Sequence, residues 1–223
     1  MDKLVPAFKE SVFDAHLSDV LSDTIELGIN SILDENIFKD IPIFSIVMGI
    51  SKTAQNIYDR NLLRQTATFI QAFNMGSISP KKLQKYRDKI DSEPQYAEKD
   101  LGQVLILLNS YVDSEKSVIL AKFYRAYVEK AISWEKFCEF SDVISRIFIS
   151  DIQLLYKIFN HQVSNTTQCE EYQVDRLVAL GLLKTSGRVT EEENSGGGTT
   201  VNITDDRNLD CSDLGSVFCR FAK

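Results

Sequence analysis

The feature that most constrains the fold is a long helical pattern that begins at Asp40 and is almost wholly apolar over its first turns. Asp40 is a favourable helix N-cap, and Pro42 falls in the first turn, where its missing N–H is not needed. Apolar residues then continue at helical spacing as far as Phe73, and Gly76 is expected to end the helix. At about 1.5 Å per residue, such a helix would be about 50 Å long. It is the longest element that the sequence predicts and the one expected to organise the rest.

The segment from Ile41 to Ile50 is apolar nearly all the way round, whereas polar residues claim one face from Ser51 onwards. A helix of this kind is expected to be buried on all sides over its N-terminal third. The segment is too short to cross a bilayer as it stands. The sequence leaves three roles open for it: core, partner surface or membrane contact. The side chains that would form such a partner or membrane surface are Ile41, Ile43, Phe44, Val47 and Met48.

Further helices are expected wherever apolar residues recur at helical spacing between short polar joints. Their expected ranges are 3–16, 18–35, 80–91, 95–112, 115–130, 134–149 and 151–161, the last of them capped by Ser150. Short joints favour antiparallel neighbours. We therefore predict a multi-helix bundle over residues 1–162.

The composition changes near Val163, and residues 163–223 are expected to form a second, smaller domain whose first helix could be 151–161. A helix at 170–180 stops at Gly181, and the short strands "LLKTSGRVT" and "TTVNIT" follow, separated by a flexible acidic loop. A final helix is capped by Ser212. This order of elements resembles a winged-helix module. The predicted fold class is thus mostly α, a helical bundle with a small C-terminal winged-helix-like α+β module.

The winged-helix resemblance implies a DNA-binding regulator, but the charges argue against that use. A recognition helix needs side chains that reach phosphates and base edges. The available cations are Arg176, Lys184 and Arg188, which stand beside Glu170, Glu171, Asp175 and Glu191 to Glu193 in a chain of net charge −7. A nucleic-acid partner is therefore not expected, and a protein-contacting role suits the same shape better.

Catalytic, metal and cofactor sites are not predicted. The chain has only two histidines, and its four cysteines form no CxxC pair, so neither a catalytic triad nor a zinc site can be proposed. The pattern favours reduced thiols in a cytoplasmic protein. We expect no secretory signal and no transmembrane helix, because the N-terminus lacks an apolar core and no apolar run approaches about 18 residues.

The segment "PKKLQKYRDKID" is the most basic in the chain. Its cations are Lys81, Lys82, Lys85, Arg87 and Lys89. They form either a solvated helix face or a contact for an anionic surface, such as lipid headgroups or an acidic partner.

The pattern "DIPIFSIVMGISK" resembles a segment of uncharacterised bacterial and phage helical proteins, and residues 20–75 are faintly similar to HeLo-like membrane-permeabilising bundles. The resemblance implies a bacterial defence or prophage setting, with oligomerisation at a membrane. No functional residue is carried over from it.

Three functions follow, in order of preference. The first is a non-enzymatic protein that binds another protein or itself. The second is a membrane-acting effector, peripheral to the membrane, that exposes residues 41–50 on activation. The third is a winged-helix transcriptional regulator.

Overall fold

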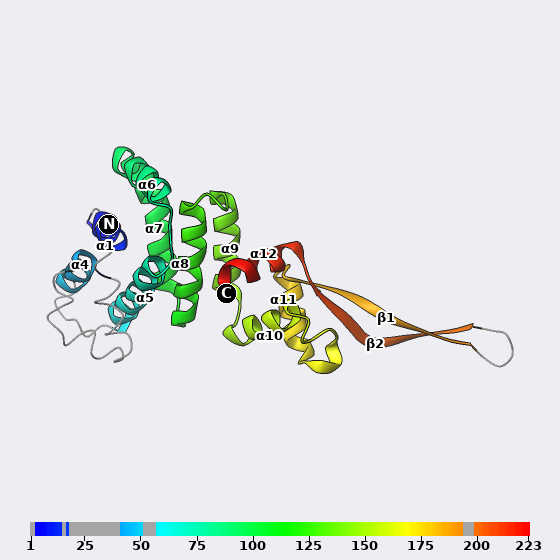
Figure 1. Ribbon diagram of the computed structural model, residues 1–223. Helices are drawn as coiled ribbons and strands as arrows, with labels where there is room; N and C mark the ends of the chain where they lie inside the picture. Colours follow the sequence, from blue (N-terminus) through cyan, green and yellow to red (C-terminus); the bar gives the residue numbers. More distant parts are fainter. Residues whose placement is uncertain (1–2, 15–16, 18–40, 51–56, 194–198) are drawn as a thin grey trace. The chain divides into compact units, whose positions relative to one another are not determined.

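The computed structural model describes residues 3–14, 17, 41–50, 57–193 and 199–223 (Figure 1). The chain is mostly helical, with one two-stranded antiparallel sheet near its C-terminus, as the sequence predicts. It divides into two compact units, Met1–Ser145 and Arg146–Lys223. This division lies before the expected boundary at residue 162, so the helix that begins at Ile149 belongs to the C-terminal unit.

The N-terminal unit is a bundle of helices. They are α1 (Leu4–Val12), α4 (Pro42–Ile50), α5 (Ile57–Asn74), α6 (Pro80–Ser92), α7 (Pro94–Ser110), α8 (Ser114–Val128) and α9 (Trp134–Arg146). The expected helix 3–16 is shorter, and the expected helix 18–35 lies outside the described residues. The long helix predicted from Asp40 is described as α4 and α5, and residues 51–56 between them lie outside the description.

The core of this unit is built around α5 and α8, which pack against each other, while α1 packs against α4 and α7. Aromatic rings fill the centre. The ring centroids of Phe69 and Phe73 on α5 each lie 5.8 Å from that of Tyr124 on α8, and Phe8 on α1 lies 5.8 Å from Phe69. These side chains are fully buried or nearly so, and large apolar rings of this kind supply most of the burial that stabilises such a bundle.

Helix α6 lies over this core by a narrow apolar stripe. Its only buried residues are Tyr86 and Ile90, four apart and therefore on one face of the helix. Pro94 begins α7 directly after Glu93, so the chain turns between α6 and α7 with a single linking residue. The turn holds Tyr86 against the buried faces of α7 and α8.

The C-terminal unit consists of α10 (Ile149–Phe159), a short 3₁₀ turn η2 (Thr166–Gln168), α11 (Glu171–Ala179), β1 (Leu183–Glu193), β2 (Thr199–Cys211) and α12 (Asp213–Ala222). Helix α10 begins earlier than expected. Its N-cap is Phe148 rather than Ser150, whose hydroxyl instead hydrogen-bonds to Asp151. The expected stop at Gly181 is correct, because Gly181 has φ 72° and the N–H of Leu182 donates to the carbonyl of Leu177.

The two strands pair from Leu183–Cys211 to Glu193–Thr199, with an irregularity between Gly187 and Arg188. Both strands are longer than expected, and β2 runs on through the polar segment 205–211. Backbone pairing with β1 outweighs the low strand propensity of its Asp and Asn residues. An isolated bridge between Asn165 and Asn208 adds a short third segment beside β2.

Ser212 caps α12, as expected, and accepts a hydrogen bond from the N–H of Gly215 at 2.9 Å. The backbone N–H of Ser212 donates to the carbonyl of Leu182 at 3.0 Å. A Cβ on Gly215 would lie 2.0 Å from that same carbonyl oxygen. Glycine is therefore the residue that lets α12 pack directly on the backbone at the start of β1.

Candidate functional site

The C-terminal unit presents a cluster of exposed aromatic rings around one arginine. The guanidinium of Arg176 on α11 lies 4.5 Å from the ring centroid of Phe148 and 4.9 Å from that of Tyr172. Both rings are 57% exposed. We call Phe148, Tyr172 and Arg176 the aromatic–arginine cluster.

Arg176 is held in this place by a fully buried carboxylate, Asp151 on α10. Its Nε donates to Asp151 Oδ2 at 2.8 Å and its Nη2 to Asp151 Oδ1 at 2.6 Å, the two-pronged geometry that suits a guanidinium. The amide of Gln173 donates to the same Oδ1 at 3.1 Å. The hydrogen bond to Asp151 raises the pKa of Arg176. The arginine is therefore fixed in position and its charge is already matched.

The neighbouring cation on β2 is also engaged by carboxylates. Arg207 Nη2 lies 2.8 Å from Glu171 Oε1 and 2.8 Å from Asp175 Oδ1, both on α11. The hydrogen bond to Asp175 raises the pKa of Arg207. The exposed surface here thus consists of the Phe148 ring before α10, the Tyr172 ring on α11 and a set of paired charges rather than unpaired cations.

The residues considered from the sequence as possible nucleic-acid contacts are Arg176, Lys184 and Arg188. Arg176 is committed to Asp151, and Lys184 Nζ lies 3.8 Å from Asp213 Oδ1. The side chain of Arg188 lies outside the described residues. The two described side chains, those of Arg176 and Lys184, are therefore each close to a carboxylate of the chain.

The side chains predicted as a partner or membrane surface lie in the core. Ile43 and Phe44 are fully buried, Ile41 is 2% exposed and Val47 is 6% exposed. Met48 is half-buried. The N–H of Ile43 donates to the buried hydroxyl of Ser11 on α1 at 3.3 Å, which ties the first turn of α4 to α1. Among the described side chains of 41–49 no large apolar residue is fully exposed, which favours the core role among the three that the sequence left open.

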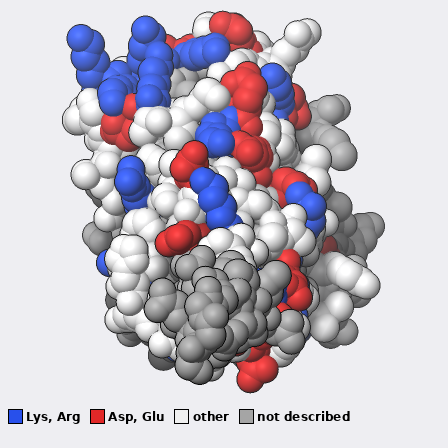
Figure 2. All heavy atoms as spheres, turned by 90° about the vertical axis from the view of Figure 1, so that its right-hand side faces the viewer, with Lys and Arg blue, Asp and Glu red and all other residues white. Residues whose placement is uncertain are grey.

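The predicted anionic-surface contacts are exposed on α6, as an outward helix face would be. Lys and Arg side chains gather at the top of the view in Figure 2, the level at which Figure 1 places α6. Lys82 pairs with Glu129 at 3.0 Å, Arg87 lies 5.8 Å from the ring centroid of Phe13, and the ammonium of Lys89 lies 3.4 Å from that of Tyr96. Lys81 and Lys85 have no ion pair among the described residues.

The sequence prediction missed the buried carboxylates that organise this chain. Asp151 and Asp100 both stand on the apolar faces of their helices, in "ISDIQLLYKIF" and "YAEKDLGQVLILL". An acidic residue within an apolar stripe was the available signal, because a buried carboxylate requires hydrogen-bond donors around it.

Within the described ranges, no three His, Cys, Asp or Glu side chains are grouped closely enough to hold a metal ion. Nor does any helix there combine the length and the apolar character needed to span a bilayer. Compared with known protein families, curated proteins and solved structures, the chain shows no significant match.

Proposed function

We propose that this chain is a non-enzymatic interaction protein whose C-terminal unit docks a partner protein through the aromatic–arginine cluster. The observation that carries the proposal is the arrangement at Arg176: its charge is neutralised from beneath by Asp151, while the rings of Phe148 and Tyr172 stay open to solvent. Tyr, Phe and Arg are enriched at the centres of protein interfaces.

Preorganisation strengthens this use of the cluster. Arg176 does not have to be ordered on binding, because two hydrogen bonds already fix its guanidinium plane between the two rings. A rigid aromatic centre loses little conformational entropy when a partner covers it.

The surroundings of the cluster indicate the partner's chemistry. Glu170, the N-cap of α11, is exposed. Glu171 and Asp175 share the single cation of Arg207 and so keep a net negative charge, and the sequence of the hairpin adds Glu191, Glu192 and Glu193. We expect a folded protein whose contact face is apolar at its centre and basic at its edge. A second copy of this chain, which is acidic overall, suits that description less well.

The two alternative functions need features that the described residues do not offer. A DNA-binding regulator needs unpaired cations on and beside α11, whereas Arg176 on α11 and Arg207 on the adjacent β2 are paired. A membrane-acting effector would have to release Ile41 to Ile50 from the core on activation, and in this structure Phe44 is fully buried.

Paired capture experiments test the proposal. The full-length chain and its Phe148→Ala/Tyr172→Ala variant serve as baits in lysate of the source cells, and Ile57→Ala is the control, because Ile57 is 73% exposed in the N-terminal unit. We expect a protein that the wild type and the control retain and the double variant loses, and that binds the purified wild type directly. If every retained protein stays bound to the double variant, the docking role is wrong.

A further inference from the structure

The N-terminal unit contains a cavity that the proposed docking role does not use. It measures about 700 Å³ and lies between the second half of α6, the start of α7 and the turn that joins α8 to α9. Tyr86, Tyr96 and Tyr127 line one side, and Val128 and Ile132 line another. Cavities of about 300–1,000 Å³ with aromatic walls and a few polar groups are typical of small-molecule sites.

Behind the tyrosine wall lies a chain of hydrogen bonds that ends at a buried carboxyl group. Tyr127 donates to Asp100 Oδ2 at 2.7 Å, and Tyr86 donates to the same oxygen at 3.2 Å. Tyr96 in turn hydrogen-bonds to Tyr127, and Tyr124 to Tyr86 at 2.6 Å. Both phenols that donate to Asp100 thus also line the cavity.

Asp100 is the part of this network that lacks a full set of partners. Its side chain is fully buried, and its Oδ1 has no hydrogen-bond partner. Burial raises the pKa of Asp100, against the opposing effect of the hydrogen bonds from Tyr127 and Tyr86 and of the nearby Lys99 and Lys89. When Asp100 carries its proton it can donate to Tyr127, and Tyr127 can then donate to Tyr96. The Tyr96 hydroxyl is thereby released to donate towards the cavity.

Three lysines that line the cavity form no ion pair within the described part of the chain. They are Lys85 and Lys89 on α6 and Lys130 in the α8–α9 turn. The ring of Tyr96 already holds the ammonium of Lys89, 3.4 Å from its centroid. The rim also contains the carboxylates of Asp88 and Glu93. The side-chain amide of Gln84 donates a hydrogen bond of 2.7 Å to Asp88 Oδ1.

Lys130 stands in a backbone conformation that favours glycine. Its φ is 57°, and it follows the end of α8, where a left-handed residue lets the N–H of Ala131 reach the carbonyl of Ala126 at 2.8 Å. A lysine in this position costs backbone energy that glycine would not. Its side chain is placed at the cavity rim, next to Ser133, whose hydroxyl accepts from the N–H of Lys136 at the start of α9.

We infer that this cavity binds an aromatic organic phosphate of mononucleotide size, with its phosphate held by Lys85, Lys89 and Lys130 and its ring against Tyr127. Lysines supply the charge, and the tyrosine faces and hydroxyls supply stacking and hydrogen bonds. The site lies in the N-terminal unit and is independent of the aromatic–arginine cluster.

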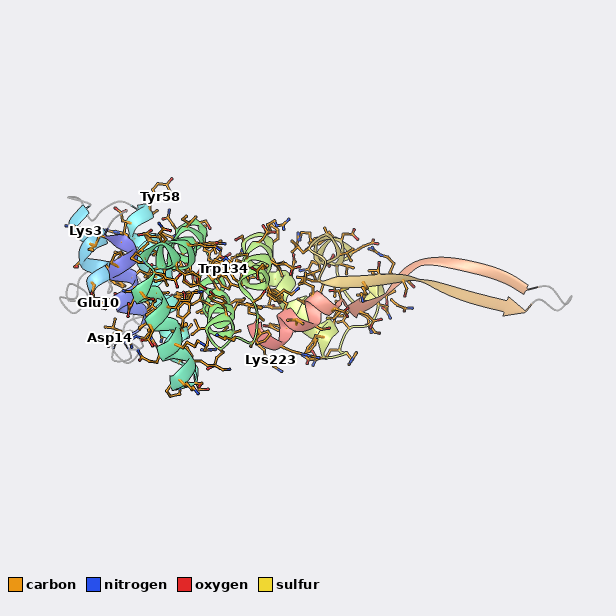
Figure 3. All side chains as sticks on the ribbon, turned by 90° about the horizontal axis from the view of Figure 1, so that it is seen from above. Lys3, Glu10, Asp14, Tyr58, Trp134 and Lys223 are labelled. Atoms are coloured by element: carbon orange, nitrogen blue, oxygen red, sulfur yellow. The ribbon has the colours of Figure 1, made fainter. Side chains whose placement is uncertain are left out.

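The single tryptophan of the chain reports on this site. Trp134 begins α9, is labelled in Figure 3, and its ring centroid lies 5.1 Å from that of Tyr127. Titration of the full chain with adenosine monophosphate should therefore change the Trp134 emission in a saturable way. Adenosine and inorganic phosphate, which each lack one half of the ligand, should bind at least about tenfold more weakly.

Lys130→Gly separates binding from folding. Glycine relieves the positive φ, so the thermal midpoint should stay the same or rise, while the affinity for adenosine monophosphate should fall about tenfold, the effect of one lost charge-assisted hydrogen bond. Lys81→Ala is the matched control, because Lys81 is exposed on α6 but does not line the cavity. It should bind as the wild type does.

Three results would overturn the inference. The first is no saturable change with adenosine monophosphate up to millimolar concentration. The second is inorganic phosphate that binds as tightly as the nucleotide, since the aromatic wall would then have no role. The third is flotation of the protein with phosphatidylserine vesicles that Lys130→Gly abolishes, which would assign the lysines to lipid headgroups.

Discussion

Phe44 is the residue whose replacement best separates a core role for α4 from a surface role. Its side chain is fully buried, and α4 packs against both α1 and α5. The change Phe44→Ala removes the ring and leaves a cavity that the neighbouring helices can only partly close.

The expected cost follows from that burial. Returning a buried phenylalanine ring to water costs about 1.5–3 kcal/mol, and with the residual cavity Phe→Ala changes in cores cost about 3–5 kcal/mol. We therefore expect Phe44→Ala to lower the free energy of unfolding of the N-terminal unit by about 3–5 kcal/mol. Were Phe44 on an exposed partner or membrane surface, the same change would stay within about 0.5 kcal/mol.

Urea unfolding followed by Trp134 fluorescence measures this difference, because the only tryptophan lies in the N-terminal unit. With a urea dependence of about 2 kcal/mol per molar, the midpoint should fall by about 2 M. Ile57→Ala, at a residue 73% exposed, should leave the midpoint nearly unchanged. If Phe44→Ala unfolds at the midpoint of the wild type, the assignment of α4 to the core is wrong.

Three further predictions concern the C-terminal unit, the buried carboxyl group and membranes. Gly215→Ala should destabilise the C-terminal unit by about 1–3 kcal/mol, because the new methyl group would meet the Leu182 carbonyl. Thermal unfolding followed by circular dichroism measures this, with Gly187→Ala as the control, because a Cβ at Gly187 meets no atom within 4 Å. Because burial raises the pKa of Asp100 above its ordinary value of 3.8, the folded chain holds that proton more tightly than the unfolded chain, so stability should fall as the pH rises from 3.8 through the raised pKa. Asp100→Asn should remove this fall in urea titrations at several pH values, and an unchanged pH profile would contradict the reasoning. Dye-loaded phosphatidylserine liposomes should show no leakage with the wild-type chain, and leakage would favour the membrane-acting function over the docking role.

Helical periodicity made most of the bundle predictable. The helices starting at Pro80, Pro94, Ser114 and Trp134 lie close to their expected ranges, because apolar spacing is a local signal, as is the proline at the first position of the helix that starts at Pro80. The start of α10 was wrong by two residues, since Ser150 is a better cap by composition than Phe148. Tertiary packing outweighed the capping preference there.

The candidate sites depend on distances that no local pattern encodes. Asp151 and Arg176 are 25 residues apart, and their pairing follows from how α10 and α11 pack. Sequence analysis singled out Arg176 but interpreted it as a phosphate contact. The carboxylate with which Arg176 pairs, Asp151, is not its neighbour in the chain. In the same way Tyr127 meets Asp100 only after α7 and α8 have come together.

The central claim is that Arg176 on α11 and Arg207 on β2 are committed to carboxylates within the chain, which favours the proposed contact with protein over one with DNA. Fluorescence anisotropy of a labelled DNA duplex, titrated with the full chain at several salt concentrations, tests it most directly. Binding through several phosphates would give a salt slope of about −0.9 for each phosphate neutralised. No saturable binding that depends on Arg176 is expected, and any binding that is lost in the Lys81→Ala/Lys85→Ala variant is due to α6. Saturable binding whose salt slope falls by about one in Arg176→Ala would contradict it.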